Sequence, residues 1–474
     1  MAKEHPYLID GEWRSSSERI EVVNPYNGEV VGTTFGADDG AVEDAVSASV
    51  RAFEETRALP AYRRADILEG VVRGIGERAE EIARTITAES GKPINSARGE
   101  VTRALSTFQL ALEEAKRLGG EVVPLDSAVG SEKRTGIVRR FPIGPIFAIT
   151  PFNFPLNLVA HKVAPAMASG NAILLKPSPS TPITALILGE IISKAGWPSG
   201  GINIFLCSNN QTEGIVRDER VAMVTFTGSA SVGWRMKGMA GRKKVALELG
   251  GNAGVIVHSD SDMDYAVKRC VTGAFAFSGQ VCISVQRIYV QREVYATFVE
   301  RFLEAVGALE MGDPMDEDTE MGPLIVEAAA VRTEEWVKEA VEGGAKLLTG
   351  GNRRGSFFEP TVLTGIQPGM RLSCEEAFAP IVVVEPYDAF EDAVDSINDS
   401  PYGLQAGLFT SDMKRIFYAF DKLNVGGVVA NDVPTYRVDN MPYGGIKMSG
   451  FGREGVRYAM EEMTEPKLLV LNLS

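Results

Sequence analysis

The sequence has few of the residues that build metal sites and disulfide frameworks. Among 474 residues there are three histidines and four cysteines, and no two cysteines form a C-x-x-C pair. Zinc sites and disulfide scaffolds need such residues at short, repeated spacing, so the sequence predicts neither. One of the four cysteines (Cys207, Cys270, Cys282, Cys374) remains available as a nucleophile.

Long apolar runs and an excess of basic charge are also missing. No apolar run is long enough to cross a bilayer. The first residues, MAKEHPYLIDGEW, lack the basic and apolar segments of a secretory signal, so we expect a cytoplasmic protein. The formal charge of −15 would repel nucleic acid and anionic membranes, and we expect neither as a partner. A small anion could still bind at a locally basic spot.

The apolar pattern that is present predicts an α/β fold. A chain of 474 residues exceeds what one core usually organises, so two or three packed units are expected. Residues 41 to about 118 have the pattern of amphipathic helices. Short apolar strands then alternate with helices, which indicates βαβ units and a parallel sheet. The expected strands are 146–150, 171–176, 202–206, 221–226 and 245–249, with helices at 159–167, 183–194, 211–217 and after Ser229.

Two later segments extend this pattern. The alternation resumes between residues 253 and about 427, with strands near Val255, Ile288, Val382 and Val428, and predicts a second α/β domain. Residues 467–473 (KLLVLNL) form an apolar strand with no partner adjacent in sequence. Such a strand pairs either with another subunit or within its own chain, and the sequence favours neither alternative.

A nucleotide site requires open backbone N–H groups at a strand-to-helix turn. Residues 226–233 (FTGSASVG) follow an expected strand and open a helix, so they could bind a phosphate. Lys176 ends the neighbouring strand, at the edge where open α/β sheets bind ligands. It could bind ribose hydroxyls or a phosphate, or it could be a solvated lysine. The string GIGERA at 74–79 has nucleotide-like spacing but follows no strand, and we expect an ordinary helix there.

Three further strings place polar groups where chemistry could use them. Cys282 lies in the loop GQVC between an expected helix (263–277) and strand (286–291), where a thiolate can be reached; the other three cysteines are expected to be structural. Glu248 interrupts an apolar strand that ends at a glycine pair, and burial would raise its pKa toward that of a general base. Asn153, on the proline-bounded turn PFNFP, could donate to an oxyanion.

Together these strings resemble the aldehyde dehydrogenase superfamily over essentially the whole chain. PFNFP, KPS, FTGS, LELGG, FSGQVC, EEAFAP and PYGGIKMSGFGRE occur in the family's order, and Glu248 and Cys282 have the family's spacing of 34 residues. The resemblance implies a Rossmann-like cofactor domain (1–118 and 140–249), an α/β catalytic domain (250–454) and a β-arm (119–139 and 455–474). Such an arm implies a homodimer or homotetramer.

The resemblance also implies oxidation of an aldehyde to a carboxylate with NAD or NADP and without a metal. Cys282 would be the nucleophile, forming a thiohemiacetal and then a thioester. Asn153 and the Cys282 backbone N–H would hold the oxyanion, and Glu248 would activate the hydrolytic water. The implied cofactor site consists of Thr150, Phe152, Lys176, Ser178, Gly228, Ser229, Gly233, Leu249, Glu376 and Phe378.

Two departures from common family patterns bear on specificity. Pro179 stands where many NAD-specific members carry a glutamate, so a 2′-phosphate is not repelled and we expect NADP to be accepted, with Ser178 or Ser180 as a hydrogen-bond partner. Arg437 replaces an aromatic residue common in members that oxidise aliphatic aldehydes, which predicts an anionic substrate such as a semialdehyde or a phosphorylated aldehyde.

The expected substrate pocket leaves several alternatives open. By analogy it consists of Leu158, His161, Val281, Ile283, Arg437, Tyr443 and Arg103. Either arginine could instead form a salt bridge, on the surface or between domains. His161 stands where succinate-semialdehyde enzymes often carry an arginine, and small hydroxyaldehydes such as lactaldehyde fit as well.

Two other functions compete with this interpretation. A CoA-acylating enzyme would release the acyl group to CoA, but most such enzymes lack a glutamate at the position of Glu248. A non-catalytic binding or structural protein could keep the fold, but all the expected catalytic residues are present. Formation of NAD(P)H with a panel of aldehydes, with and without CoA, separates these alternatives.

Overall fold

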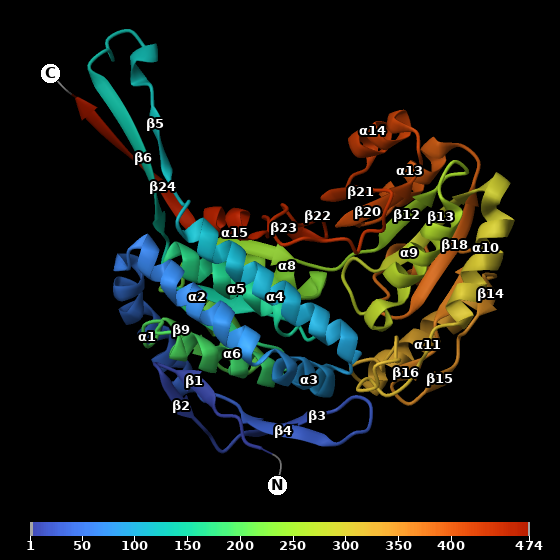
Figure 1. Ribbon diagram of the computed structural model, residues 1–474, viewed down its shortest axis with the longest axis horizontal. Coiled ribbons are helices and arrows are strands. Elements are labelled where there is room, and N and C mark those ends of the chain that lie inside the picture. Colours follow the sequence, from blue (N-terminus) through green and yellow to red (C-terminus); the bar gives the residue numbers. More distant parts are fainter. Residues whose placement is uncertain (1–2, 473–474) are drawn as a thin grey trace.

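The computed structural model describes residues 3–472, and two large sheets with their helices form the body of the molecule (Figure 1). The first sheet contains β1 (Tyr7–Ile9), β2 (Glu12–Arg14), β7 (Ile146–Ile149), β8 (Ile173–Lys176), β9 (Ile202–Ile204), β10 (Met223–Thr227), β11 (Lys244–Glu248) and β23 (Gly450–Phe451). Their order is β2-β1-β9-β8-β7-β10-β11-β23, and β7 to β11 are parallel.

The central parallel strands of the first sheet, such as β7, β8 and β10, are mainly apolar because helices cover both faces. These helices are α1 (Asp39–Ala58), α2 (Ala61–Glu77), α3 (Ala79–Ser90), α4 (Ile94–Ala115), α5 (Asn157–Ser169), α6 (Ile183–Lys194), α7 (Asn209–Arg217), α8 (Ala230–Met239) and α15 (Val456–Glu462). Every residue of α5 is buried, since α5 lies between the sheet and the layer of α2 and α4. The sequence of a strand that is covered on both faces is a continuous apolar run, as in β7 (IFAI).

The second sheet repeats this design with later segments. It contains β12 (Ala253–Val257), β13 (Val285–Gln291), β14 (Lys346–Thr349), β17 (Thr361–Thr364), β18 (Ile381–Tyr387), β20 (Gln405–Phe409) and β21 (Gly427–Ala430). The order is β14-β17-β18-β13-β12-β20-β21, so β21 is an edge strand. The helices around it are α9 (Met263–Phe275), α10 (Arg292–Gly307), α11 (Glu327–Glu342), α12 (Arg371–Cys374), α13 (Phe390–Asn398) and α14 (Met413–Lys422).

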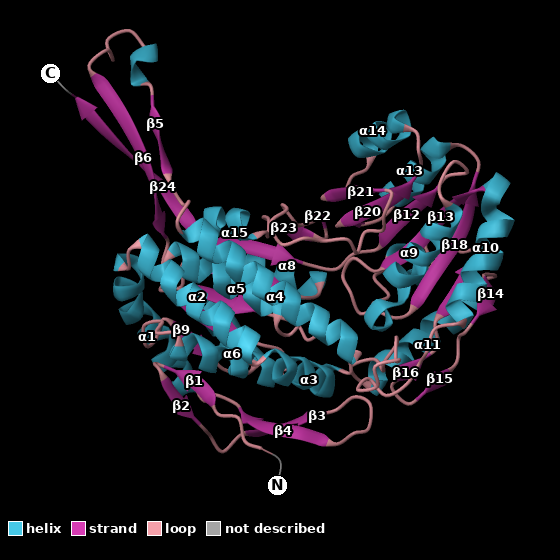
Figure 2. Ribbon diagram, in the orientation of Figure 1, coloured by secondary structure: helices cyan, strands magenta, loops and turns pink. Residues whose placement is uncertain are grey.

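A three-stranded arm projects from the body (Figure 2). It consists of β5 (Gly120–Val123), β6 (Arg134–Pro142) and β24 (Thr464–Asn472), in the order β24-β6-β5, with a 3-10 turn, η1 (Leu125–Ser127). The C-terminal strand pairs antiparallel with β6 along its whole length, from Thr464 opposite Pro142 to Asn472 opposite Arg134. Of the two alternatives for this strand, pairing within its own chain is therefore the one the structure shows. Leu473, the last residue of the expected strand, lies outside the described residues.

Smaller elements complete the described chain. They are β3 (Arg19–Val23) paired with β4 (Val30–Phe35), β15 (Arg353–Arg354) paired with β16 (Phe357–Phe358), β19 (Tyr402–Gly403) paired with β22 (Ile446–Lys447), and the 3-10 turn η2 (Ala276–Gly279). No helix within residues 3–472 is long and apolar enough to cross a membrane.

The expected α/β class and the alternation of elements are confirmed. The string at 74–79 begins inside α2, where Gly74 allows Ile191 of α6 to approach closely. The limits of the three expected domains stay a prediction. Helix α15 falls within the segment 455–474 assigned to the arm, yet its Val456 and Met460 are buried in the core around the first sheet.

Candidate functional site

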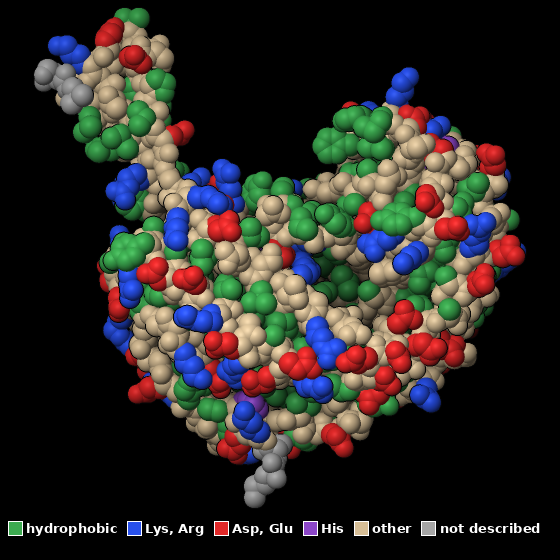
Figure 3. Space-filling model, in the orientation of Figure 1, with side chains coloured by type: hydrophobic (Ala, Val, Ile, Leu, Met, Phe, Trp, Pro, Cys, Tyr) green, Lys and Arg blue, Asp and Glu red, His purple; other side chains and the backbone are tan. Residues whose placement is uncertain are grey.

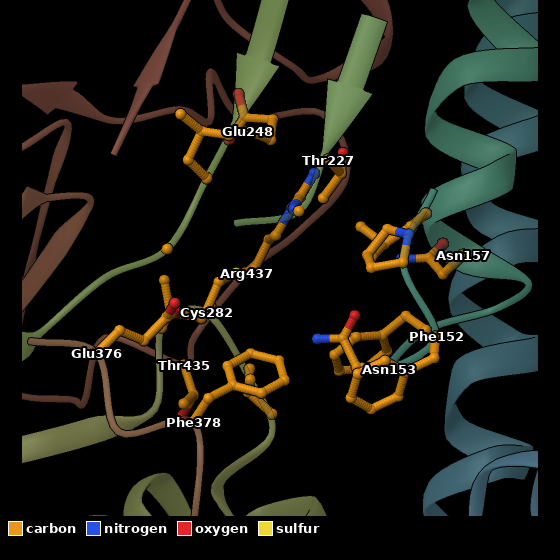
Figure 4. A pocket seen from close by; sticks show the side chains of 18 of the residues that line it. Phe152, Asn153, Asn157, Thr227, Glu248, Cys282, Glu376, Phe378, Thr435 and Arg437 are labelled. Carbon is orange, nitrogen blue, oxygen red and sulfur yellow. The ribbon is translucent and has the colours of Figure 1, made fainter. Parts of the chain in front are cut away.

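A cavity of about 530 Å³ opens where the two halves of the body meet. Figure 3 shows the surface hollowed there, and Figure 4 shows the side chains that line the cavity. The carboxyl ends of β7, β10 and β11 contribute one side and loops of the second half contribute the other. The predicted site residues on its lining are Arg103, Phe152, Asn153, Leu158, Gly228, Ser229, Glu248, Leu249, Val281, Cys282, Ile283, Glu376, Phe378, Arg437 and Tyr443.

Five predicted site residues do not line this cavity. Lys176 and Ser178 lie at and beyond the end of β8, Thr150 follows β7, and Gly233 lies in α8. Gly233 brings α8 close to Leu249, because a Cβ at this position would overlap the leucine side chain. His161 is buried in α5, in contact with Arg437.

The loop before Cys282 is held in an unusual backbone conformation. Helix α9 ends at Phe275, two residues earlier than expected, because Phe277 (φ 48°) and Ser278 (φ 54°) adopt left-handed conformations. Such non-glycine residues each cost about 1–3 kcal/mol and persist only where the surroundings hold them. Ser278 Oγ donates to Gly322 O at 2.7 Å, and Gln280 Oε1 accepts from Ile325 N at 2.9 Å. The loop is therefore rigid and fixes where Cys282 is presented.

The Cys282 thiol faces the cavity beside Tyr443. Its Sγ lies 3.3 Å from the Tyr443 hydroxyl oxygen. Burial raises the pKa of the thiol to about 11, and Glu376 and Glu248 act in the same direction, whereas Tyr443 and Arg437 oppose them. The thiol consequently holds its proton at neutral pH, and an attacking thiolate needs stabilisation from its neighbours.

Asn153 faces Cys282 across the same space (Figure 4). Its Nδ2 donates to Gln280 O at 2.9 Å, so the amide is tied to the cysteine loop. An amide nitrogen carries two hydrogens, and the second is free to donate to a ligand oxygen. Its Oδ1 is buried without a hydrogen-bond partner among the described residues. This geometry suits a donor for an oxyanion formed at Cys282.

Glu248 is the last residue of β11 and is buried at the edge of the cavity. Its Oε2 has no hydrogen-bond partner among residues 3–472. Burial, assisted by the negative charge of Glu454, raises its pKa well above the ordinary value, although Arg437 and Lys162 act against the shift. A carboxylate in such surroundings takes up a proton readily, which is the property of a general base.

A buried ion cluster lies behind the side of the cavity that Arg437 and Tyr443 line. Glu454 contacts Lys162 Nζ at 3.2 Å and an Arg437 nitrogen at 3.1 Å. Burial alone would raise the pKa of Glu454, but Lys162 and Arg437 outweigh it and lower the pKa to about 2. This cluster was not predicted from the sequence, although Lys162 is a charged residue in the largely apolar helix α5 and Glu454 ends the string PYGGIKMSGFGRE.

The two predicted substrate arginines differ in how far they are already paired. The Arg437 guanidinium contacts Glu454 and lies 3.7 Å above the Tyr443 ring. Arg103 is a third exposed and pairs with Asp439 at 2.8 Å. Asp439 also accepts from His161 Nε2 at 2.9 Å, and burial lowers the pKa of His161, which keeps its ring neutral. The Nε atoms of both arginines are buried without a partner in the described chain.

The opposite end of the cavity contains rings, turns and one carboxylate. Glu376 accepts from Gly251 N at 3.1 Å, and burial raises its pKa to about 7. The rings of Phe152 and Phe378 meet edge to face at 5.9 Å between centroids. Ser229 precedes α8 without capping it through its side chain, so the first N–H groups of α8 remain open to a ligand.

These features fit a dinucleotide. The open N-terminus of α8 suits a pyrophosphate, and Gly228 and Gly250 allow the Phe226 ring and the Glu376 carboxylate to approach the backbone at this end of the cavity. Glu376 can accept from ribose hydroxyls, and Phe378 offers a flat surface for a nicotinamide ring.

Comparisons with known proteins agree with this geometry. The model of the aldehyde dehydrogenase family matches residues 13–469. The 3-sulfolactaldehyde dehydrogenase of Priestia megaterium is 44% identical over 474 residues, covering 100% of this chain and 99% of its own. The structure of aldehyde dehydrogenase 21 from Physcomitrella patens, in complex with the reaction product succinate, is 47% identical with a TM-score of 0.98, covering 100% of this chain and 99% of its own. Glyceraldehyde-3-phosphate dehydrogenase GapN from Methanocaldococcus jannaschii, complexed with NADP, is 39% identical with a TM-score of 0.92, covering 97% of this chain and 99% of its own.

Proposed function

The chain belongs to the aldehyde dehydrogenase family and oxidises an aldehyde to a carboxylate with NAD(P)+, and from this premise we propose the role of each site residue and the substrate class. The observation that carries the proposal is the convergence of a thiol, an amide and a carboxylate, from Cys282, Asn153 and Glu248, on one cavity. These three groups come from loops and strands far apart in sequence.

The proposed mechanism begins at the thiol. Cys282 loses its proton and its sulfur adds to the aldehyde carbon, which places a negative charge on the former carbonyl oxygen. The free N–H of Asn153 and the Cys282 backbone N–H donate to that oxygen. Ser229, Glu376 and Phe378 would hold NAD(P)+, which would supply the acceptor for the hydride that leaves the same carbon. Loss of that hydride leaves a thioester on Cys282. Glu248 then takes a proton from a water molecule that attacks the thioester and releases the carboxylate.

The proposed substrate is a short aldehyde whose other end is anionic or hydroxylated. Arg103 and Arg437 line the cavity, and the Nε of each has no hydrogen-bond partner among residues 3–472. The relatives act on 3-sulfolactaldehyde or hold succinate, and both molecules carry an anionic end. Both arginines already pair with a carboxylate, Arg437 with Glu454 and Arg103 with Asp439. The Arg103 side chain is a third exposed, whereas the Arg437 side chain is buried, so Arg103 is the more accessible cation.

A panel of aldehydes tests this proposal. Succinic semialdehyde, lactaldehyde, glyceraldehyde 3-phosphate and propionaldehyde would each be assayed with NAD and with NADP. We expect the highest kcat/KM with an anionic or hydroxylated aldehyde. A preference for propionaldehyde contradicts the substrate class, and acyl-CoA formation on addition of CoA supports the CoA-acylating alternative.

We also propose a homodimer or homotetramer assembled through the arm. Leu468, Leu469, Val470 and Leu471 of β24 are between a third and a little over half exposed, and one edge of β24 is unpaired in the arm sheet. Figure 3 shows apolar side chains on the arm. A long apolar edge strand of this kind is usually covered by another chain.

Light scattering after size exclusion tests the assembly. The double variant Leu469→Lys, Leu471→Lys should shift the protein toward monomer. Val129→Lys, at a fully exposed position between β5 and β6, is the matched control and should leave the mass unchanged. A wild-type protein that runs as a monomer contradicts the proposal.

A further inference from the structure

The Cys282 sulfur contacts a hydroxyl that the proposed mechanism has not used. Tyr443 Oη lies 3.3 Å from Sγ, within hydrogen-bond reach of a sulfur atom. The apolar neighbours Val281, Ile283 and Leu404 pack around this pair and offer no side-chain donor. A phenylalanine would pack there as well as a tyrosine, so packing does not account for the hydroxyl.

The Tyr443 ring is held in place from two directions. Tyr443 and Glu454 exchange backbone hydrogen bonds, with N–O distances of 3.0 and 2.6 Å. The Arg437 guanidinium lies over the ring, 3.7 Å from its centre. The side chain is 3% exposed. The hydroxyl is thus preorganised against the sulfur and does not depend on a bound ligand for its position.

The direction of the hydrogen bond follows from the surroundings. Burial, with Cys282 next in importance, raises the pKa of Tyr443 well above its ordinary value, so the phenol keeps its proton. Of the groups facing Cys282, Glu376 and Glu248 disfavour a thiolate, whereas Arg437 and Tyr443 favour it. A protonated hydroxyl beside an anionic sulfur can only donate.

We propose that the Tyr443 hydroxyl is a catalytic hydrogen-bond donor that stabilises the Cys282 thiolate before it attacks the aldehyde. The inference rests on the proposed role of Cys282 as the nucleophile. The S–H bond breaks and its proton leaves to solvent, while Tyr443 keeps its own proton throughout. Tyr443 therefore contributes to formation of the nucleophile rather than to binding of the aldehyde.

The variant Tyr443→Phe tests the proposal, because it removes the hydroxyl and keeps the ring beneath Arg437. Alkylation of Cys282 by iodoacetamide would be followed between pH 6 and 10 by mass spectrometry of the cysteine peptide. We expect the alkylation rate to fall about tenfold throughout this pH range, because a thiol pKa that is higher by about one unit leaves about a tenth of the thiolate at each pH below it. The pre-steady-state burst of NAD(P)H should slow similarly, and KM for the aldehyde should stay within about twofold.

Tyr436→Phe is the matched control, since Tyr436 lies in the same loop and its side chain is half exposed. It should alter neither alkylation nor the burst. An unchanged alkylation profile in Tyr443→Phe overturns the proposal, and so does a raised KM with an unchanged profile, which would assign the hydroxyl to substrate binding. Full turnover in Cys282→Ala would instead refute the nucleophile itself and leave no role for Tyr443 in activating it.

Discussion

The two ends of the cavity contain different kinds of chemical group. At the cofactor end, backbone N–H groups, glycines and two phenylalanine rings surround Glu376, which forms no ion pair within residues 3–472. At the substrate end, Arg103 and Arg437 join a buried cluster with Asp439 and Glu454. The first end offers mainly backbone groups and rings, whereas the second contains charged side chains that pair with one another.

Two buried glutamates show how neighbouring charges set the pKa of a carboxyl group. Glu454 contacts two cations and has a pKa lowered to about 2. Glu248 is equally buried but pairs with no cation in the part of the chain that the structure describes, and its pKa is raised. The same side chain thus becomes a permanent charge in one place and a proton acceptor in the other, according to its partners alone.

Removal of the Cys282 thiol should have the largest effect on turnover, because in the proposed mechanism both the aldehyde and the cofactor react at the carbon bound to this sulfur. Cys282→Ala should lower turnover at least about a thousandfold with every aldehyde and either cofactor. Cofactor binding, measured by quenching of protein fluorescence, should remain. Cys207→Ala is the control, since that thiol contacts Thr212 and does not line the cavity.

The next largest effect is expected from Glu248→Gln. The burst of NAD(P)H should persist, while steady-state turnover falls about 10²- to 10⁴-fold and a thioester accumulates on Cys282, visible by mass spectrometry. In the wild type, Glu248 becomes protonated and stops acting as a base as the pH falls through its pKa. Because this pKa is raised, the loss of activity should begin at a higher pH than it would for an ordinary glutamate. Steady turnover in the variant would refute the role of Glu248.

A smaller and selective effect is expected from Arg103→Met. KM for an anionic aldehyde should rise about 10- to 100-fold, because a charged hydrogen bond is lost, while KM for propionaldehyde stays within about twofold. Arg98→Met is the matched control in the same helix, since Arg98 pairs with Glu80 and Glu317 away from the cavity. An equal rise in KM for both aldehydes would show that Arg103 maintains the structure of the site and does not bind the anionic end of the substrate.

The smallest effect on activity is expected from a substitution at the end of the cavity proposed to bind the cofactor. Pro179 is exposed just after β8, and the wild type should turn over both NAD and NADP. Pro179→Glu should lower kcat/KM with NADP about fivefold by repelling the 2′-phosphate, with NAD changed less than about twofold. A wild type that uses NAD but not NADP contradicts this expectation.

The sequence predicted local features better than contacts between distant segments. Helix α6 has its expected limits, because an apolar run between prolines defines them. The left-handed residues Phe277 and Ser278 were not foreseen, since contacts with Gly322 and Ile325, not local preference, hold that loop. Lys162 could have been found by the criterion applied to Glu248, a charge in an apolar element. Its partner Glu454, 292 residues away, could not.

The strained loop before Cys282 also makes the position of the reactive sulfur depend on segments that come later in the chain. Ser278 and Gln280 are anchored to Gly322 and Ile325, and only a glycine fits at position 279, against the backbone of Ala379. These anchors are synthesised well after the cysteine itself. A nascent or partly unfolded chain therefore lacks the supports that aim the sulfur, and the enzyme acquires its reactive centre only once the later half of the chain has docked.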